Sequence, residues 1–559
     1  MNKITKRIII VVGVLFLLVK GMEWVIEYRF QNIINRSPER KYNISYKDFD
    51  LHTFFKGVTL KEVEIVPVSI DSGTVIIGSV DYARLEGLVW YQLMFARRLQ
   101  IDGIMFSQPT FNITLSDHEK KKTSGKGMQN LFKDIISRAR VKRFQIDQGS
   151  VILMDPSNER IRGKLSNLNL KATEIKTDSV IFNHLIPFKL GSFQASIDSV
   201  SFDLNEYTHL SSGRLAYSKK GSKLILQDLQ MKYLIDWKEV SQKIGKQTDL
   251  MEISLKELII ERLEASNSFY SDLDIEAHKI VLSDLVFKDY RDKNMPRPPD
   301  AVKPLFKGMV DAIPITLNVD TIQLNNVDVV YTELGKGKSM AGTIRFEDIH
   351  GSIIRLTTLE EQQKSYQSFE ANLTARLNGV ADLSFDLTVP YNREEFIAIA
   401  NVGSMDLTQL NETALGMAGV EVISGDVEKI HFEMRATKNS SHNKMQFDYE
   451  NLKIHVLKEG KDHQMKNQGL ISTFANSAIR NHNVPRHGKY LTADYVSQRN
   501  IYRGPFNFMW QSLADGMLHI VPGKMVQDVI GVDKETKEEE KKERKKEKKK
   551  NKKHHKKDQ

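Results

Sequence analysis

Histidine is the residue type in this chain best suited to bind a metal or relay a proton, and the chain has fifteen of them. None lies in an HExxH arrangement or in another spacing that brings metal ligands together. His554 and His555 are adjacent, but they lie in a highly charged tail. Cysteine is absent, which excludes thiolate metal ligands, disulfides and cysteine nucleophiles. The sequence therefore predicts no metal site.

Two further patterns resemble fragments of catalytic sites. Gly337-Lys338-Ser339 matches the end of a phosphate-binding loop, but Thr332 occupies the position of that loop's first glycine. We interpret this segment as a hairpin loop. Neighbouring acids such as Glu360 and Glu361, or Asp289 and Asp292, are interpreted as loop charges, and no GxSxG turn occurs. We expect no catalytic residues, no cofactor and no enzyme activity.

A short pattern recurs along the chain and indicates the elements. Two apolar residues stand at i and i+2, a small polar residue follows at i+3, and a new apolar strand begins about four positions later. Period-2 spacing marks one face of a strand, and small polar residues bend the backbone easily. We predict a mainly β protein with one long, mostly antiparallel sheet folded as an elongated groove and a few short helices. The copies are Leu99-Gln-Ile101-Asp102 before Phe106, Phe144-Gln-Ile146-Asp147 before Val151, Ile280-Val-Leu282-Ser283 before Phe287, and Ile322-Gln-Leu324-Asn325 before Val329.

Length and charge narrow the class of protein. A chain of 559 residues exceeds the size of a single core, so several domains or one extended sheet are expected. The net charge is +10, but residues 534–559 hold thirteen Lys, one Arg and seven acids, a net +7. The remainder is close to neutral, which argues against a nucleic-acid-binding groove.

The N-terminus contains the only apolar run long enough for a membrane. Residues 8–19 are apolar, Lys3, Lys6 and Arg7 precede them, and residues 21–26 extend the run toward the thickness of a bilayer. A cleaved signal peptide would also fit this length, but no small-x-small cleavage site follows. We predict an uncleaved anchor, with residues 1–7 in the cytoplasm and the rest of the chain outside it.

Helical spacing predicts three short helices within the body, at 87–99, 128–138 and 236–245, with residues 117–126 as a loop. Four prolines in residues 294–304 indicate a linker there. The predicted organisation is a cytoplasmic end and anchor (1–28), a first β-groove region (29–293), the linker (294–304), a second β-groove region (305–503), an amphipathic helix (504–530) and a disordered Lys-rich tail (531–559).

The clearest strand pair spans residues 371–389. A two-residue Asn378-Gly379 turn would mix the two faces, so we predict a three- or five-residue loop that keeps all odd positions together. The result is an apolar strip that either lines a sandwich core or holds a ligand. The candidates for a lipid-binding strip are Leu373, Leu377, Leu383, Phe385 and Leu387.

Residues 506–521 switch to helical spacing, with Phe506, Trp510, Leu513, Met517 and residues 520–521 on one face. Trp510, Leu513 and Met517 are candidate membrane contacts, because an aromatic amphipathic helix before a Lys-rich tail is typical of membrane interfaces. A terminal helix docked on the last strands is the alternative. The tail itself either binds anionic surfaces or only solubilises the chain.

Several stretches together resemble the AsmA-like superfamily, single-anchored envelope proteins of Gram-negative bacteria, and in particular the large members from Bacteroidetes-type bacteria. The resemblance covers most of residues 1–520, and its motifs are structural rather than catalytic. It is carried by KYNISYKDFDLHTFFKGVTLKEVEI (41–65), RRLQIDGIMFSQPTFNITL (97–115), VKRFQIDQGSVILMD (141–155), VDTIQLNNVDVVYTE (319–333), AGTIRFEDIHGSI (341–353), VISGDVEKIHFEM (422–434), FDYENLKIHVL (447–457), FANSAIRNHNVP (474–485) and GPFNFMWQSLADGM (504–517).

The resemblance implies an open β-groove with an apolar floor that binds or moves lipids, chiefly phospholipids, between the inner and outer membranes. We therefore expect a single-pass inner-membrane protein with a periplasmic body that supports outer-membrane biogenesis. Its expected partners are membrane lipids, the inner membrane through its first helix and an anionic surface through its tail. A structural or assembly factor for outer-membrane proteins is the alternative function.

Overall fold

The structure is a computed structural model of the chain. It describes residues 3–35, 40, 42–52, 57–68, 75–89, 92–96, 100–114, 141–155, 160–175, 191–263, 275–459, 465–467, 479–486, 488 and 490–521. The predicted helix at 128–138, the loop at 117–126, the Lys-rich tail and the last part of the 504–530 segment lie outside these residues.

The predicted fold class is confirmed. The described chain is mainly β, with one 25-stranded, mostly antiparallel sheet, an apolar N-terminal helix and a few short helices. It divides into two compact units, one formed by residues 1–231 and 257–278 and the other by residues 232–256 and 279–559. The Pro-rich segment 294–304, predicted as a linker, therefore falls inside the second unit.

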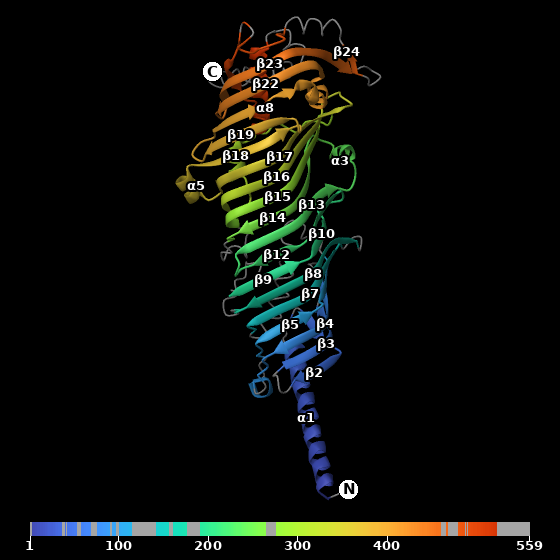
Figure 1. Cartoon of the computed structure of the whole chain (residues 1–559). Helices are drawn as coiled ribbons and strands as arrows, with labels where there is room; N and C mark the ends of the chain where they lie inside the picture. Colours follow the sequence, from blue (N-terminus) through green and yellow to red (C-terminus); the bar gives the residue numbers. More distant parts are fainter. Residues whose placement is uncertain are drawn as a thin grey trace, which may run out of the picture. The chain divides into compact units, whose positions relative to one another are not determined.

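The first unit begins with helix α1 (Lys3–Asn35). Figure 1 draws this helix in dark blue, extending away from the first strands. The segment from residue 9 onward is long and apolar enough to cross a membrane. The last turns of α1 are different, because Ile26, Phe30 and Ile34 are buried in the core of this unit. The Phe30 ring lies 5.7 Å from Phe49 and 6.3 Å from Tyr46. One helix therefore supplies both an exposed apolar segment and a docking turn.

The strands of the first unit pair mainly with their chain neighbours, but β5 and β6 run parallel to β7. Strands β13, β14 and β15 contribute residues to both units. The bounds are β1 Tyr42–Ser45, β2 Asp48–His52, β3 Gly57–Pro67, β4 Val75–Glu86, β5 Gly103–Ser107, β6 Thr110–Thr114, β7 Arg143–Met154, β8 Ile161–Thr173, β9 Ser192–Ile197, β10 Ser199–Asp203, β11 Thr208–Ser212, β12 Leu215–Ser218, β13 Lys223–Tyr233, β14 Asp249–Glu261 and β15 Ile275–Asp292.

The recurring sequence pattern is a β-bulge. Three copies lie inside single strands, and the residue at i+4 of each copy has a left-handed backbone, with φ of 55° at Gln148, 53° at Asp284 and 57° at Asn326. The pairing register shifts at the bulges of β7 and β16. Such a residue bends the strand and increases its twist. The predicted bends are therefore real, but in these three copies the residues before and after the bend belong to one strand.

The first copy of the pattern is confirmed in its second half, because β5 with Phe106 begins after the bend at Asp102, whereas Leu99 lies outside the described residues. The segment that pairs with Phe144–Asp147 is Ile104–Ser107, not Leu99–Asp102. It is followed by Gln108 with φ of 52°. The Gln108 side chain donates a hydrogen bond to Gln148 at 3.2 Å, so two consecutive bends lie side by side.

The second unit contains the remaining elements. The strands are β16 Leu317–Leu334, β17 Ala341–Thr357, β18 Ser368–Leu377, β19 Ala381–Pro390, β20 Phe396–Val402, β21 Met405–Asp406, β22 Val420–Ala436, β23 Ser440–Glu459, β24 Met465–Asn467 and β25 Ala493–Gln498. The helices are α3 Trp237–Ile244, α4 Phe306–Asp311, α5 Glu360–Tyr366, α6 Asn411–Thr413 and α8 Pro505–Ile520, with single turns η4 Leu407–Leu410 and η5 Ala414–Ala418.

Two predicted helices can be compared with the structure. The helix at 236–245 is confirmed as α3, with the Asp236 side chain accepting from the Lys238 N–H and Gly245 ending the helix in the left-handed region. Of the predicted helix at 87–99, residues 87–89 are not helical and residues 92–96 form one π-helical turn, η2 (Gln92–Ala96), in the first unit, while residues 90–91 and 97–99 lie outside the described residues. In this turn Leu93 is buried and Phe95 is 86% exposed. A π turn takes more residues than an α turn, so the 3.6-residue period does not apply.

Helix α8 docks on the apolar side of β22, β23 and β25, and Figure 1 shows it behind β22 and β23. Its buried residues follow a four-residue spacing: Phe508, Ser512, Gly516 and Ile520. The predicted face is therefore rotated. Trp510 is 50% exposed, whereas Leu513 and Met517 are half-buried against the core. The structure shows the docked alternative. Small residues on the buried side of α8 let the helix approach the sheet closely.

We predict that docking of the last turns of α1 stabilises the first unit. Phe30 is 2% exposed, so Phe30→Ala would leave a cavity and should lower the free energy of unfolding by about 3–5 kcal/mol. Denaturation of the full chain in detergent, followed by circular dichroism, measures this. Trp24→Ala is the control, since Trp24 is exposed. An equal effect of both substitutions would contradict the docking.

We also predict that Gly516 sets the distance between α8 and the sheet. An added Cβ would overlap the Tyr495 hydroxyl and lie 2.5 Å from the Met445 sulfur. Gly516→Ala should therefore destabilise the second unit by about 1–3 kcal/mol, although alanine favours a helix. Gly504→Ala is the matched control, because its methyl group would meet nothing within 4 Å. A stabilised Gly516→Ala protein would show that the contact is loose.

Candidate functional site

The β18–β19 hairpin forms the centre of the predicted apolar strip. Leu377 pairs with Ala381, so the loop has three residues, which is one of the two predicted lengths. Asn378 and Gly379 both have a positive φ, which lets so short a loop close. Leu373 pairs with Phe385 across the hairpin. The odd positions of both strands therefore share one face, as predicted.

The five strip candidates all lie on this face but differ in burial. Leu387 is buried, whereas Leu373, Leu377, Leu383 and Phe385 are half-buried. Leu387 pairs with Ala398 of β20, whose neighbours are covered by helices α4 and α8. The Phe306 ring of α4 lies 5.0 Å from Phe396 in an edge-to-face contact. The helices therefore seal one part of the apolar face and leave the part around β18 only partly covered.

The partly covered face extends to β15. A second apolar cluster is centred on buried Leu324, Val327 and Ile349 in β16 and β17. Half-buried side chains surround it: Leu282, Leu285, Ile322, Val329, Phe346, Leu373 and Ala375. Leu373 belongs to both clusters and joins them. We call the half-buried apolar surface over β15–β19 the apolar face of the second unit.

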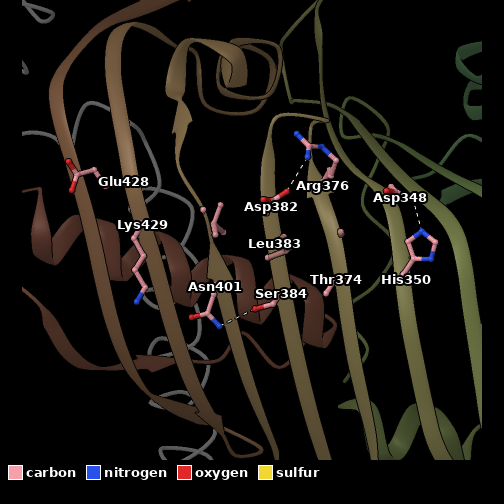
Figure 2. Close-up of a pocket in the computed structure, with 13 residues that line it drawn as sticks. Asp348, His350, Thr374, Arg376, Asp382, Leu383, Ser384, Asn401, Glu428 and Lys429 are labelled. Atoms are coloured by element: carbon pink, nitrogen blue, oxygen red, sulfur yellow. Dashed lines mark hydrogen bonds and ion pairs between the residues drawn. The ribbon is translucent and has the colours of Figure 1, made fainter.

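The opposite face of the same strands is polar. A depression of about 640 Å³ lies there. Figure 2 shows its lining, in which several polar side chains pair with one another, and the strip candidate Leu383 lines it as well. Arg376 lies 3.1 Å from Asp382, and the Asn401 amide donates to Ser384 at 3.1 Å. Asp348 accepts from His350 at 2.7 Å. These contacts form a mixed-charge solvated surface around the bulge at Asp348.

A charged cluster interrupts the apolar face where β14, β15 and β16 meet. Asp249 of β14 accepts two hydrogen bonds from the Arg291 guanidinium of β15, at 2.5 and 2.6 Å. Glu333 of β16 accepts from the Tyr331 hydroxyl at 2.8 Å and lies 2.8 Å from the Lys293 ammonium. We call Asp249, Asp289, Arg291, Lys293, Tyr331 and Glu333 the strand-end cluster.

The neighbouring strands place this cluster on the apolar face. The Lys293 N–H donates to the Leu334 carbonyl, and the Asn326 amide reaches Asp284, so β15 and β16 run in the same direction. Side chains alternate between the faces of a strand. Asp289 and Arg291 therefore follow Leu285, and Tyr331 and Glu333 follow Val327, on the same side of the sheet. The Tyr290 ring lies 5.3 Å from the Trp237 ring of α3, in a tilted contact on the other side.

Asp289 was interpreted as a loop charge, and that interpretation was wrong. It lies in β15, is half-buried, and its Oδ1 atom has no hydrogen-bond partner among the described residues. Burial, together with the nearby Asp249 carboxylate, raises its pKa to about 6, although Arg291 opposes this. The sequence did contain a signal for this position. Asp289 and Arg291 are a charged pair at positions that the alternation of β15 assigns to the apolar face.

Two further sequence features can be compared with the structure. Among the described residues, no group of three or more His, Asp or Glu side chains could hold a metal ion. Gly337 and Lys338 lie between β16 and β17 in a hairpin loop, as expected, and the Lys338 ammonium donates to the carbonyls of Gly416 and Met417. A comparison of the chain with protein-family models and with curated proteins finds no match.

We predict that ionised Asp289 destabilises the second unit. Its folded pKa exceeds its unfolded value, so stability that is present below about pH 4 is lost as the pH rises through about 6. Asp289→Asn removes this loss and should be more stable than the parent by about 1–2 kcal/mol at pH 7.5, with the difference vanishing near pH 4. Urea unfolding at both pH values measures it. Parallel pH profiles for the two proteins would show that Asp289 is fully hydrated.

Proposed function

We propose that the protein is a membrane-anchored lipid-binding protein and that the apolar face of the second unit holds lipid acyl chains. The observation that carries the proposal is the uneven covering of this face. Helices α4 and α8 cover the apolar side chains of β20–β25 and the buried part of β18 and β19, whereas other apolar side chains on the same face, among them Leu285, Phe346 and Leu373, remain half-buried. A contiguous half-buried apolar surface is typical of a binding site.

The size of the apolar face suits an acyl chain. Residues rise about 3.3 Å along a strand, so the five steps from Leu282 to Phe287 span roughly 17 Å, comparable with the roughly 15 Å of hydrocarbon in one leaflet. Each methylene that leaves water for this face contributes about 0.8 kcal/mol. Binding of this kind requires apolar area and access rather than reactive groups. Strand-end charges would then lie where an amphiphile changes from tail to headgroup.

The anchor and the resemblance to AsmA-like proteins extend this proposal to a location. Helix α1 carries Lys3, Lys6 and Arg7 before its apolar segment, which favours a cytoplasmic N-terminus. We infer a single-pass inner-membrane protein with a periplasmic body that transfers phospholipid toward the outer membrane and so supports outer-membrane biogenesis. Exposed Trp510 and the Lys-rich tail are proposed as a reversible contact with an anionic membrane surface.

The test compares three aspartate substitutions in the full chain. Leu373→Asp places a charge on the half-buried face, where water can hydrate it, and should remove most co-purified phospholipid with a small fall in melting temperature. Thr374→Asp places the same charge on the exposed polar face and should keep the lipid. Val389→Asp, at a fully buried position, should unfold the unit, since an unpaired buried charge costs several kcal/mol.

Mass spectrometry of lipid extracted from each detergent-purified protein gives the readout. A parent protein without phospholipid would overturn lipid binding and favour the assembly-factor alternative. Equal lipid content in the Leu373→Asp and Thr374→Asp proteins would place any lipid outside the apolar face. If Leu373→Asp and Val389→Asp unfold alike, the face is a closed core.

A further inference from the structure

The apolar face changes character along its strands as an amphiphile does. In β15, Leu282, Leu285 and Phe287 lead into Asp289 and Arg291 on the same side of the sheet. In β16, Val327 and Val329 lead into Tyr331 and Glu333. An acyl chain lying along the apolar part of these strands would bring its polar end to the strand-end cluster. The cluster is therefore placed to contact a headgroup.

The charges of the cluster do not balance. Arg291 is neutralised by Asp249 through two short hydrogen bonds, and Lys293 is neutralised by Glu333. Asp292, the next acid in the strand, is 2% exposed on the other side and accepts from the Asn294 N–H at 2.8 Å. Asp289 is left as one negative charge in excess, with an oxygen that nothing among the described residues pairs.

We infer that the strand-end cluster binds the ammonium group of an amine-bearing phospholipid, with Asp289 as its ion partner. This inference rests on the proposed lipid-binding function of the apolar face. An ammonium group supplies both a positive charge and the hydrogen-bond donors that a carboxylate accepts. The Tyr331 and Glu333 oxygens on the neighbouring strand are further acceptors.

Other ligands suit the cluster less well. A phosphate would meet two cations whose charge is already neutralised, together with three carboxylates that repel it. A divalent metal needs several oxygen ligands around one point, and the described residues provide no such group. The charge excess of one therefore favours a monovalent organic cation.

The energetics of Asp289 agree with this assignment. Burial and the Asp249 carboxylate raise its pKa, which means that the ionised form is under-compensated in the empty protein. Burial also raises the pKa of Tyr331 on the neighbouring strand and of Tyr233 of β13. Both hydroxyls are therefore neutral and do not supply the missing charge. A bound ammonium would supply the missing charge and restore the ordinary pKa of this carboxyl.

The experiment measures headgroup selectivity in the full chain. The detergent-purified protein is equilibrated at pH 7.5 with mixed vesicles of phosphatidylethanolamine and phosphatidylglycerol in equal amounts, and bound lipid is identified by mass spectrometry. The parent protein should enrich the amine lipid about fivefold, which is modest for a charge-assisted hydrogen bond because the site is partly hydrated. N-acylated phosphatidylethanolamine, which has lost the positive charge, should not be enriched.

Substitutions separate this inference from lipid binding itself. Asp289→Asn should abolish the enrichment, so that the two lipids are recovered in equal amounts, and its raised stability at this pH guards against loss of fold. Asp386→Asn, at an exposed position on the polar face of β19, should behave like the parent.

Equal binding of the two lipids by the parent, or full enrichment in Asp289→Asn, would overturn the assignment while leaving lipid binding intact. A parent protein that binds neither lipid would overturn both the inference and the proposed function.

Discussion

The left-handed residue inside each bulged strand is the constraint on which the second unit depends. At Asp284 and Asn326 the backbone leaves the extended conformation for one residue, and the strand resumes beyond it. The bend adds one residue to the alternation, so apolar residues before and after it remain on the same side only if the sequence skips a position. Leu282 and Leu285 are spaced by three for this reason, and both pack in one cluster.

The same constraint explains how much could be predicted from the sequence. The odd-numbered strip of β18 and β19 and the length of its hairpin loop followed from period 2, because those strands lack a bulge. The recurring pattern identified the bends, although the left-handed residue is the one that follows the small polar residue of the pattern. It did not single out Ile104–Ser107, which precedes the left-handed Gln108 and pairs with Phe144–Asp147.

The errors have a common physical origin in tertiary packing. A helical wheel of α8 selects its largest apolar residues, but the sheet selects Ser512 and Gly516, because a close approach needs small side chains. Helical spacing could not predict the burial of Leu93 and the exposure of Phe95, because a π turn takes more residues than an α turn. Asp289 was missed because charge was taken as evidence of a loop, although the register of β15 continues through it.

Ionised Asp289 and the half-buried apolar face both lower the stability of the second unit, and the fold itself requires neither. Sealing β15–β19 with a longer helix would bury more apolar area, and an asparagine at position 289 would remove an under-compensated charge. Natural chains hold such features where a ligand completes them, because selection keeps stability only above a threshold. Both features lie on the same side of β15, and Phe287 and Asp289 are successive residues on that side. An amphiphile with an apolar chain and a cationic end would offset both at once, which neither a purely apolar ligand nor a free ion would do.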